Sequence, residues 1–443
     1  MPPPDRFRYD GFAIDQADSV VHCRYTAGGH SFAERFTFPG GEWDDPAVLA
    51  AVRLLALIVG VSYYKTTAAP LIDLGDTPTT AAEREFLRTF YVSGLGEFAY
   101  RNGLDLRGLR VEGPDAGPVS PAAYAPDPGR PLIPFGGGID SIVTVAALAA
   151  EHRDTALCVV EPPGARFAAI EDAAAVTELP VTRVERTLDP LVRRSADLGF
   201  LNGHVPVTAV NTAATLVAAV LQGRDAVVLS NEWSASVPTL VVDGHPVNHQ
   251  WSKGEEFERA FGDLVLSALG PHLSVFSYLR PRTELWVAAE FALLPQYHGA
   301  FRSCNRAFAQ DPSQRLDHWC GRCDKCCFVD LVLAPFMDRV DLESVFAGDE
   351  PLQNPANEAR FRALLGLGDD AKPFECVGDV DECRAATVLA ERRADRAGND
   401  LLARLRAELG NAAPADPDAL LQPRGTHRIP DRYAPPDLLV RAR

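Results

Sequence analysis

The sequence predicts an α/β protein built around a mostly parallel sheet. Apolar runs of strand length alternate with longer helical patterns, namely strands at 132–135, 156–160 and 226–230 and helices at 141–152, 168–178 and 207–222. Parallel strands need long crossover connections, which are usually helices, so this alternation is typical of βαβ units. The central part of the chain therefore predicts a parallel sheet covered by helices.

The N-terminal part predicts a different organisation. Residues 7–40 alternate between apolar and polar side chains, with Gly28-Gly29 between the runs, as in a β-hairpin or meander. Helical patterns follow at 46–60 and 81–101. We expect four regions: an α+β module over 1–115, a Pro-rich linker over 116–131, the parallel-sheet domain over 132–340, and a mostly helical region with an irregular tail over 341–443.

Composition excludes several classes of function. The 443-residue chain has 60 acidic and 43 basic residues and a formal net charge of -17, without a concentrated basic cluster. Such a chain repels a phosphodiester backbone, so we expect no nucleic-acid partner. No apolar stretch reaches the roughly 20 residues of a membrane helix, and no signal-peptide core follows the N-terminus. We expect a cytoplasmic protein that acts on a small molecule; nothing in the sequence indicates its oligomeric state.

A glycine loop lies between the first central strand and its helix. It contains Gly136, Gly137 and Gly138, followed by Asp140 and Ser141. Glycines let the backbone approach a ligand closely, and the N-terminus of the next helix attracts phosphate. Asp140 is expected to reach a metal ion on the phosphates and Ser141 to donate to a phosphate oxygen. The alternative is a plain turn in which Asp140 caps the helix.

The loop lacks the lysine of the common P-loop, and it resembles instead the Ser-Gly-Gly-x-Asp-Ser loop of the N-type ATP pyrophosphatase (PP-loop) superfamily. The resemblance implies an adenine nucleotide alpha hydrolase-like fold that binds ATP and Mg²⁺ and releases AMP and diphosphate. Gly136 departs from that pattern, because it stands where the superfamily usually has serine.

A cysteine cluster predicts a metal site. Cys320, Cys323 and Cys326 form C-x-x-C-x-x-C, and Cys304 lies upstream. Four thiolates suit a structural zinc ion, three at this spacing also suit an iron–sulfur cluster, and an empty thiol-rich loop or redox pair is the plainer alternative. The segment is similar to the zinc site of 7-cyano-7-deazaguanine synthase, another superfamily member, and this resemblance implies structural Zn²⁺.

Several polar strings predict substrate contacts. One follows the strand at 226–230, and ligands of open α/β sheets bind at the carboxyl ends of strands. For each residue the alternative is a surface salt bridge or a capped turn. The candidate substrate-binding residues are Asn231, Glu232, Ser234, Ser236, Lys253, Arg280, Arg282, Tyr63 and Lys65.

Together these strings resemble the UDP-N-acetylmuramoyl-L-alanyl-L-glutamate epimerase family over roughly residues 7–385. The matching segments are Gly-Val-Ser-Tyr-Tyr-Lys (60–65), the glycine loop, Ser-Asn-Glu-x-Ser-Ala-Ser (230–236), Asn-His-Gln-Trp-Ser-Lys (248–253), the cysteine knuckle (320–326, with Cys304) and Lys-Pro-Phe-Glu-Cys-Val-Gly (372–378). The resemblance implies a peptidoglycan-precursor enzyme. It would use ATP and Mg²⁺ to invert the terminal L-Glu to D-Glu and release AMP and diphosphate.

Epimerisation needs a proton carrier, because adenylation of the carboxylate makes the α-proton acidic enough for a side-chain base to remove. Candidates are Cys376, His249, Lys253, Tyr63 and Lys65. Cys376 is the first choice, since it lies outside the zinc set and a nearby cation would lower the pKa of its thiol. Its alternative is a buried small residue. Arg280 and Arg282 are candidates for the substrate's diphosphate or carboxylates.

Two other functions stay open on the sequence. One is an amide-forming or nucleobase-modifying ligase of the same superfamily, which would also bind ATP and zinc. The other is a non-catalytic, zinc-stabilised binding protein with a degenerate loop, which Gly136 alone supports.

Overall fold

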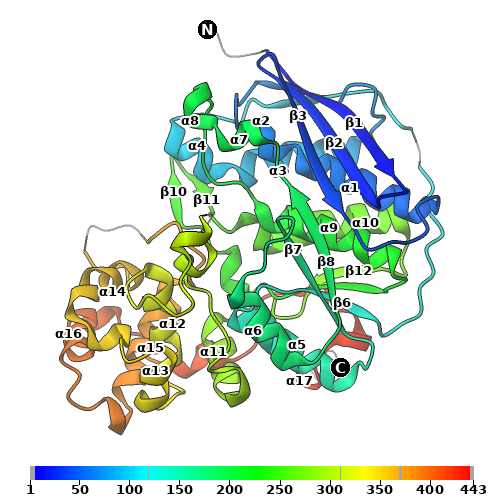
Figure 1. The fold of residues 1–443 in the computed structure, drawn as a ribbon. Helices are drawn as coiled ribbons and strands as arrows, with labels where there is room; N and C mark the ends of the chain where they lie inside the picture. The colour runs from blue at the N-terminus through cyan, green and yellow to red at the C-terminus, as the bar shows by residue number, and fades with distance from the viewer. Residues whose placement is uncertain (1–4, 118, 310, 369–371, 440–443) are drawn as a thin grey trace.

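The computed structural model describes residues 5–117, 119–309, 311–368 and 372–439 (Figure 1). Within them one ten-stranded sheet has the order β12-β9-β6-β7-β8-β3-β2-β1-β4-β5. Its strands are β1 (Phe7–Asp15), β2 (Val20–Ala27), β3 (His30–Thr37), β4 (Leu71–Asp73), β5 (Arg110–Glu112), β6 (Pro131–Pro134), β7 (Ala156–Glu161), β8 (Val181–Thr187), β9 (Ala226–Leu229) and β12 (Ser274–Ser277). A separate hairpin joins β10 (Leu240–Val242) to β11 (His245–Val247).

The helices surround this sheet. They are α1 (Pro46–Val59), α2 (Val61–Tyr64), α3 (Ala81–Gly94), α4 (Gly96–Asn102), α5 (Ile139–Glu151), α6 (Ala168–Thr177), α7 (Pro190–Arg193), α8 (Ser195–Leu198), α9 (Val207–Leu221), α10 (Glu255–Leu269), α11 (Glu284–Ala292), α12 (Asp324–Leu333), α13 (Arg339–Val345), α14 (Glu358–Leu364), α15 (Val380–Glu391), α16 (Asp400–Leu409) and α17 (Pro436–Leu439). The predicted central strands and helices begin and end within two residues of the observed ones.

The central half of the sheet is parallel, as predicted. Strands β12, β9, β6, β7 and β8 all pair in parallel. Numbered along the chain, this half has the order 3-2-1-4-5 of a doubly wound α/β sheet. The winding reverses between β6 and β9. Ligands of such sheets bind at this reversal, outside the carboxyl ends of the strands, and the glycine loop follows β6 there.

The N-terminal meander is also present, and it extends the same sheet. β1, β2 and β3 pair antiparallel, and β3 joins β8 antiparallel between residues 35–37 and 185–187. The predicted α+β module therefore has no sheet of its own in the described chain. The single helix predicted over 81–101 is two helices, α3 and α4, which meet at Leu95 between Gly94 and Gly96. Glycine has low helix propensity, so two of them weaken the helix at this point.

Alternate residues of the central strands face two helical layers. Leu132, Ala156 and Val227 join the core cluster that contains α1, α9 and α10. Their chain neighbours join a second cluster with α5, α6 and α11. This alternation follows from the two-residue period of a strand. The run Pro46–Tyr64 is long and apolar enough to cross a membrane, but 83% of its most apolar window is buried inside the fold.

The C-terminal helices form a lobe on the opposite side of the molecule from β1–β3 (Figure 1). α12 packs against α15, and α11 contacts both, so the lobe is continuous with the helical layer that covers the sheet. Part of the tail is anchored on the sheet: Tyr433 donates to Asp225 Oδ1 at 2.6 Å. The helical character predicted for the C-terminal region is thus present.

The glycine loop packs tightly against α6 at one position. Gly137 has φ +73°, and a Cβ there would lie 2.4 Å from the carbonyl oxygen of Ala169. At Gly136, by contrast, the described chain has no atom within 4 Å of an added Cβ. Gly137 is therefore required by the backbone, whereas Gly136 faces open space.

We expect Gly137→Ala to lower the free energy of unfolding by about 2 kcal/mol or more, because it adds a left-handed non-glycine residue and a clash with a backbone atom. The matched Gly136→Ala variant should change it by less than about 1 kcal/mol. Urea unfolding followed by circular dichroism measures both. Equal destabilisation of the two variants would contradict this account of the loop.

Candidate active site

A cavity of about 430 Å³ lies at the carboxyl ends of β6, β7 and β9. Segments far apart in the sequence meet there: the glycine loop, the string after β9, the 3-10 turn η2 (Trp251–Lys253), the cysteine knuckle and the segment 372–378. The predicted site residues that line it are Gly136, Gly138, Asp140, Ser141, Asn231, Lys253 and Cys376. The sequence-predicted loop and the first-choice proton carrier therefore share one cavity.

The glycine loop presents the N-terminus of α5 to the cavity. Gly138 is the N-cap, and among the described residues no side chain caps the helix. The Ser141 hydroxyl donates to the Gly138 carbonyl at 3.0 Å. The alternative in which Asp140 caps the helix is therefore wrong. The free N–H groups and the positive end of the helix suit an anionic ligand such as phosphate.

Three carboxylates meet beside the loop. Asp140, Glu232 and Glu284 each place an oxygen within 4.8 Å of the others. They follow β6, β9 and β12, which are adjacent in the sheet, so parallel register brings them to one edge. Asp140 Oδ1 and Glu284 Oε2 are buried without a hydrogen-bond partner among the described residues.

The half-buried Asp140 and the buried Glu232 and Glu284 repel one another. Burial and the charge of Asp140 raise the pKa of Glu232, and burial with Asp140 and Glu232 raises the pKa of Glu284. Unpaired carboxylate oxygens in this arrangement are hard ligands of the kind that Mg²⁺ binds. The donor set therefore fits a divalent cation beside a phosphate-binding loop.

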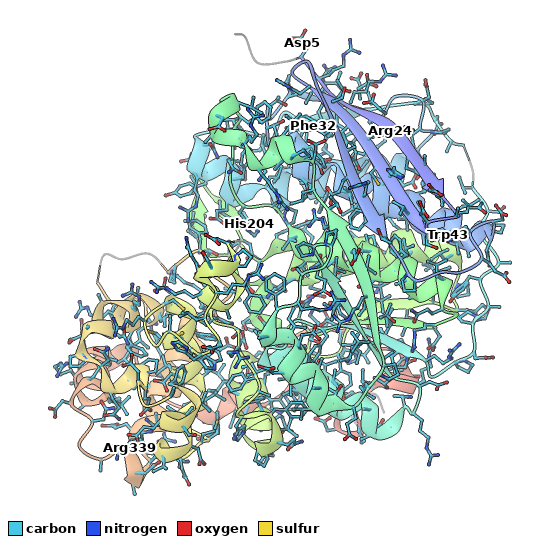
Figure 2. All side chains as sticks on the ribbon, viewed as in Figure 1. Asp5, Arg24, Phe32, Trp43, His204 and Arg339 are labelled. Atoms are coloured by element: carbon cyan, nitrogen blue, oxygen red, sulfur yellow. The ribbon has the colours of Figure 1, made fainter. Side chains whose placement is uncertain are left out.

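Cys376 lies in a second group of titratable residues. The charge of His249 acts on the Cys376 thiol and lowers the pKa of the thiol, and His249 Nδ1 lies 2.5 Å from Glu97 Oε2. Arg101 Nε donates to the other Glu97 oxygen at 2.6 Å. His204 (labelled in Figure 2) packs on His249 with ring centroids 4.2 Å apart. The result is a carboxylate–imidazole–thiol chain that ends at the cavity.

The charges of this chain are set by its surroundings. Burial alone raises the pKa of Cys376, but Lys253 and the hydrogen bond with His249 lower it to about 6. Burial lowers the pKa of His249, whereas Cys376 and Glu97 raise it to about 9. At neutral pH the pair is therefore a thiolate and an imidazolium, so Cys376 has the charge of a base and is not a plain buried residue.

Lys253 connects the two groups. Burial lowers the pKa of its ammonium, but Cys376, Glu232 and Asp140 raise it above the ordinary value. The side chain thus stays charged between the thiolate and the carboxylates. It is placed to neutralise negative charge that develops on a ligand between them.

The four predicted cysteines come together. Cys304, Cys320, Cys323 and Cys326 place their sulfurs within 4.8 Å of one another. Cys326 Sγ lies 3.4 Å from Cys323 Sγ and 3.6 Å from Cys320 Sγ. A regular tetrahedron of Zn–S bonds of about 2.3 Å has edges of about 3.8 Å, so the geometry fits zinc. In the described chain all nine cysteines are free thiols.

Both arginines expected to bind substrate are engaged elsewhere, which corrects that prediction. Arg280 is 1% exposed, pairs with Glu258 at 2.8 Å, and donates to the carbonyls of Glu232 at 2.7 Å and Lys253 at 2.5 Å. Arg280 therefore holds the two loops that carry site residues. Arg282 pairs with Asp437 and lines a different cavity.

Apart from Asn231 and Lys253, the other predicted substrate contacts also lie outside the cavity lining. Tyr63 is fully buried and accepts from the Asp189 N–H at 3.2 Å, and Lys65 donates to Asn202 Oδ1 at 2.7 Å. Ser236 accepts from the first N–H of α10, and Ser234 is buried in the 3-10 turn η1 (Trp233–Ser236). These polar side chains pack against the protein or cap a helix. Their sequence pattern does not distinguish such roles from ligand binding.

Sequence reasoning missed three residues that the structure brings to the site: Glu97, Glu284 and Lys325. Glu97 lies inside the helix predicted over 81–101, Glu284 lies two residues after Arg282, and Lys325 lies between two cysteines of the knuckle. Their partners are more than 50 residues away in the chain. Only the tertiary structure shows these partnerships.

Comparison with known proteins agrees with this geometry. A family model described as the MurL N-terminal domain matches residues 2–278, and the MurL C-terminal domain matches residues 300–420. Three curated relatives are each 38% identical and are named UDP-N-acetyl-alpha-D-muramoyl-L-alanyl-L-glutamate epimerase. They come from Xanthomonas oryzae pv. oryzae (96% of this chain and 95% of the relative), Salinispora tropica (97% and 95%) and Micromonospora sp. (97% and 97%). The chain therefore belongs to the MurL family.

Proposed function

We propose that this protein is an ATP-dependent epimerase that inverts the terminal L-Glu of UDP-N-acetylmuramoyl-L-alanyl-L-glutamate to D-Glu. The observation that carries the proposal is one cavity lined by both a glycine loop that leads into an uncapped helix N-terminus and a thiol with a lowered pKa. The named activity of the relatives supports the substrate and the reaction class. The product would enter peptidoglycan precursor synthesis.

Activation comes first in the proposed reaction. A substrate carboxylate oxygen attacks the α-phosphorus of ATP, diphosphate leaves, and a mixed anhydride with AMP forms. The glycine loop and the N-terminus of α5 receive the phosphates. Asp140, Glu232 and Glu284 would hold Mg²⁺, which would neutralise charge on the leaving diphosphate.

Proton transfer follows. The anhydride withdraws electrons, so the α-proton becomes acidic enough for the Cys376 thiolate to remove it. His249, oriented by Glu97, stabilises the thiolate before the transfer, and the Lys253 ammonium stabilises the enolate that forms. A proton returns to the opposite face of the α-carbon. Water then hydrolyses the anhydride and releases AMP and the D-Glu product.

The two halves of this reaction can be separated by substitution. Asp140→Asn should lower AMP and diphosphate formation by about 100-fold or more, because it weakens both the cation site and the loop. Cys376→Ala should keep AMP formation and lose solvent deuterium incorporation at the glutamate α-carbon. Mass spectrometry and chiral analysis of the product measure both, with exposed Asp127→Asn as the control.

The same assay tests the rival functions. A chain that forms AMP only with a nucleobase or amine substrate, and never D-Glu from the muramoyl dipeptide, would be a ligase of the superfamily. A chain that turns over no ATP with any of these substrates would be a binding protein.

We expect a bell-shaped pH profile of kcat/KM that falls below about pH 6, where the Cys376 thiolate is protonated, and above about pH 9, where His249 loses its proton. Glu97→Gln removes a charge that raises the pKa of His249, so the alkaline limb should move to lower pH. An unchanged profile in Glu97→Gln, equal to that of the exposed control Glu85→Gln, would remove Glu97 from the site.

The cysteine knuckle should hold about one zinc ion per chain, measurable by inductively coupled plasma mass spectrometry. Cys320→Ser should lower the occupancy to near zero and reduce Tm, because metal binding contributes directly to folding. Cys327→Ala, next to the set but outside it, should keep the metal. Iron instead of zinc, or full occupancy in Cys320→Ser, would contradict the assignment.

A further inference from the structure

Lys325 connects the cysteine knuckle to the catalytic cavity. It is the second residue of α12 and lies between two knuckle cysteines in the sequence. Its Nζ donates to the carbonyl oxygen of Cys376 at 2.5 Å and lies 5.0 Å from the centre of the Phe328 ring. The side chain also lines the cavity. The ammonium of a knuckle residue thus holds the backbone of the proposed base.

A second contact comes from the other end of the cysteine set. Asn305 directly follows Cys304, and its Nδ2 donates to Glu375 Oε1 at 2.9 Å. Asn305 lines the same cavity as Lys325. Both parts of the cysteine set, which lie some twenty residues apart in the chain, therefore contact the two consecutive residues Glu375 and Cys376.

The position of the segment 372–378, which carries Cys376, depends on such side-chain contacts. Residues 372–378 are described without helix or strand, so no backbone ladder fixes them. Gln250 Nε2 donates to the Val377 carbonyl at 3.3 Å, and the Phe374 ring packs against Arg101 and Tyr100. An irregular segment with few anchors moves unless those anchors are rigid. A metal-bound knuckle is a rigid anchor.

We propose that the four-cysteine knuckle is a positioning device for the proton-transfer segment, in which Lys325 and Asn305 hold Cys376 against His249 and Lys253. The role of Cys376 rests on the proposed function. A metal held by the four thiolates would fix the start of α12 and the 304–305 turn, and Lys325 and Asn305 would transmit that fixed position to the thiol. Lys325 and Asn305 are positioning residues and need not touch the reacting carbon.

The knuckle supplies its own matched control. Arg322 is also a basic knuckle residue, but its side chain is 75% exposed and lies 3.8 Å from Asp349, away from the segment. Loss of Arg322 changes the charge of the knuckle as loss of Lys325 does. It does not remove a contact to Cys376.

The test measures how readily Cys376 reacts with iodoacetamide as pH is varied, with the modified peptide identified by mass spectrometry, in the full chain with the metal it carries on purification. In Lys325→Met the pH midpoint of Cys376 alkylation should move up by about one pH unit. The thiol loses one nearby cation, and it is no longer held against His249 and Lys253. Arg322→Met should keep the wild-type midpoint. Removal of the metal from the wild-type chain should move the midpoint up, although Lys325 keeps its charge.

Asn305→Ala, at an exposed position, should shift the alkylation midpoint in the same direction. This variant tests the proposal if Lys325→Met does not fold. Metal removal from Lys325→Met should add little, because the two changes act through one contact. A wild-type midpoint in both variants, or in the metal-free chain, overturns the proposal. The alkylation needs neither ATP nor turnover, so this outcome is distinct from a failure of the epimerase assay.

Discussion

Three carboxylates, two of them buried and one half-buried, lie within 4.8 Å of one another at the edge of the sheet, and they are stable only when cations or protons compensate their charge. Lys253 supplies one positive charge. This charge does not fully offset the repulsion among the carboxylates, because the pKa values of Glu232 and Glu284 are still raised. The same lysine stabilises the Cys376 thiolate. One buried cation therefore lies between the carboxylates beside the glycine loop and the Cys376 thiol, and the charge of both groups depends on its position.

That position is fixed by residues that never meet a ligand. Arg280 is buried, neutralised by Glu258, and donates to the carbonyls of the two loops that carry Glu232 and Lys253. A guanidinium has several donors in a fixed plane, so one side chain can hold both loops at once. The polar residues around the cavity are thus of two kinds: some line it, and others, such as Arg280, hold the loops that line it in position.

The sheet order explains why the site can combine two chemistries. The parallel half places three strand ends side by side and offers a helix N-terminus for an anion. The helical lobe contributes the cysteine knuckle and the segment that carries Cys376, while α4 contributes Glu97 from the N-terminal part. In the proposed reaction, activation would take place at the edge of the sheet, and proton transfer would take place where these three distant parts of the chain meet.

The sequence by itself determined the central strands and helices, the glycine loop and the four-cysteine set, because each is a local pattern of spacing or periodicity. It also indicated Cys376, His249 and Lys253 as chemistry-bearing residues. Only the tertiary structure decided that Arg280, Arg282, Tyr63 and Lys65 pack or pair elsewhere, and that Glu97, Glu284 and Lys325 belong to the site. A charged side chain in sequence does not reveal its partner, because these partners lie in segments far apart in the chain that only the tertiary packing brings together.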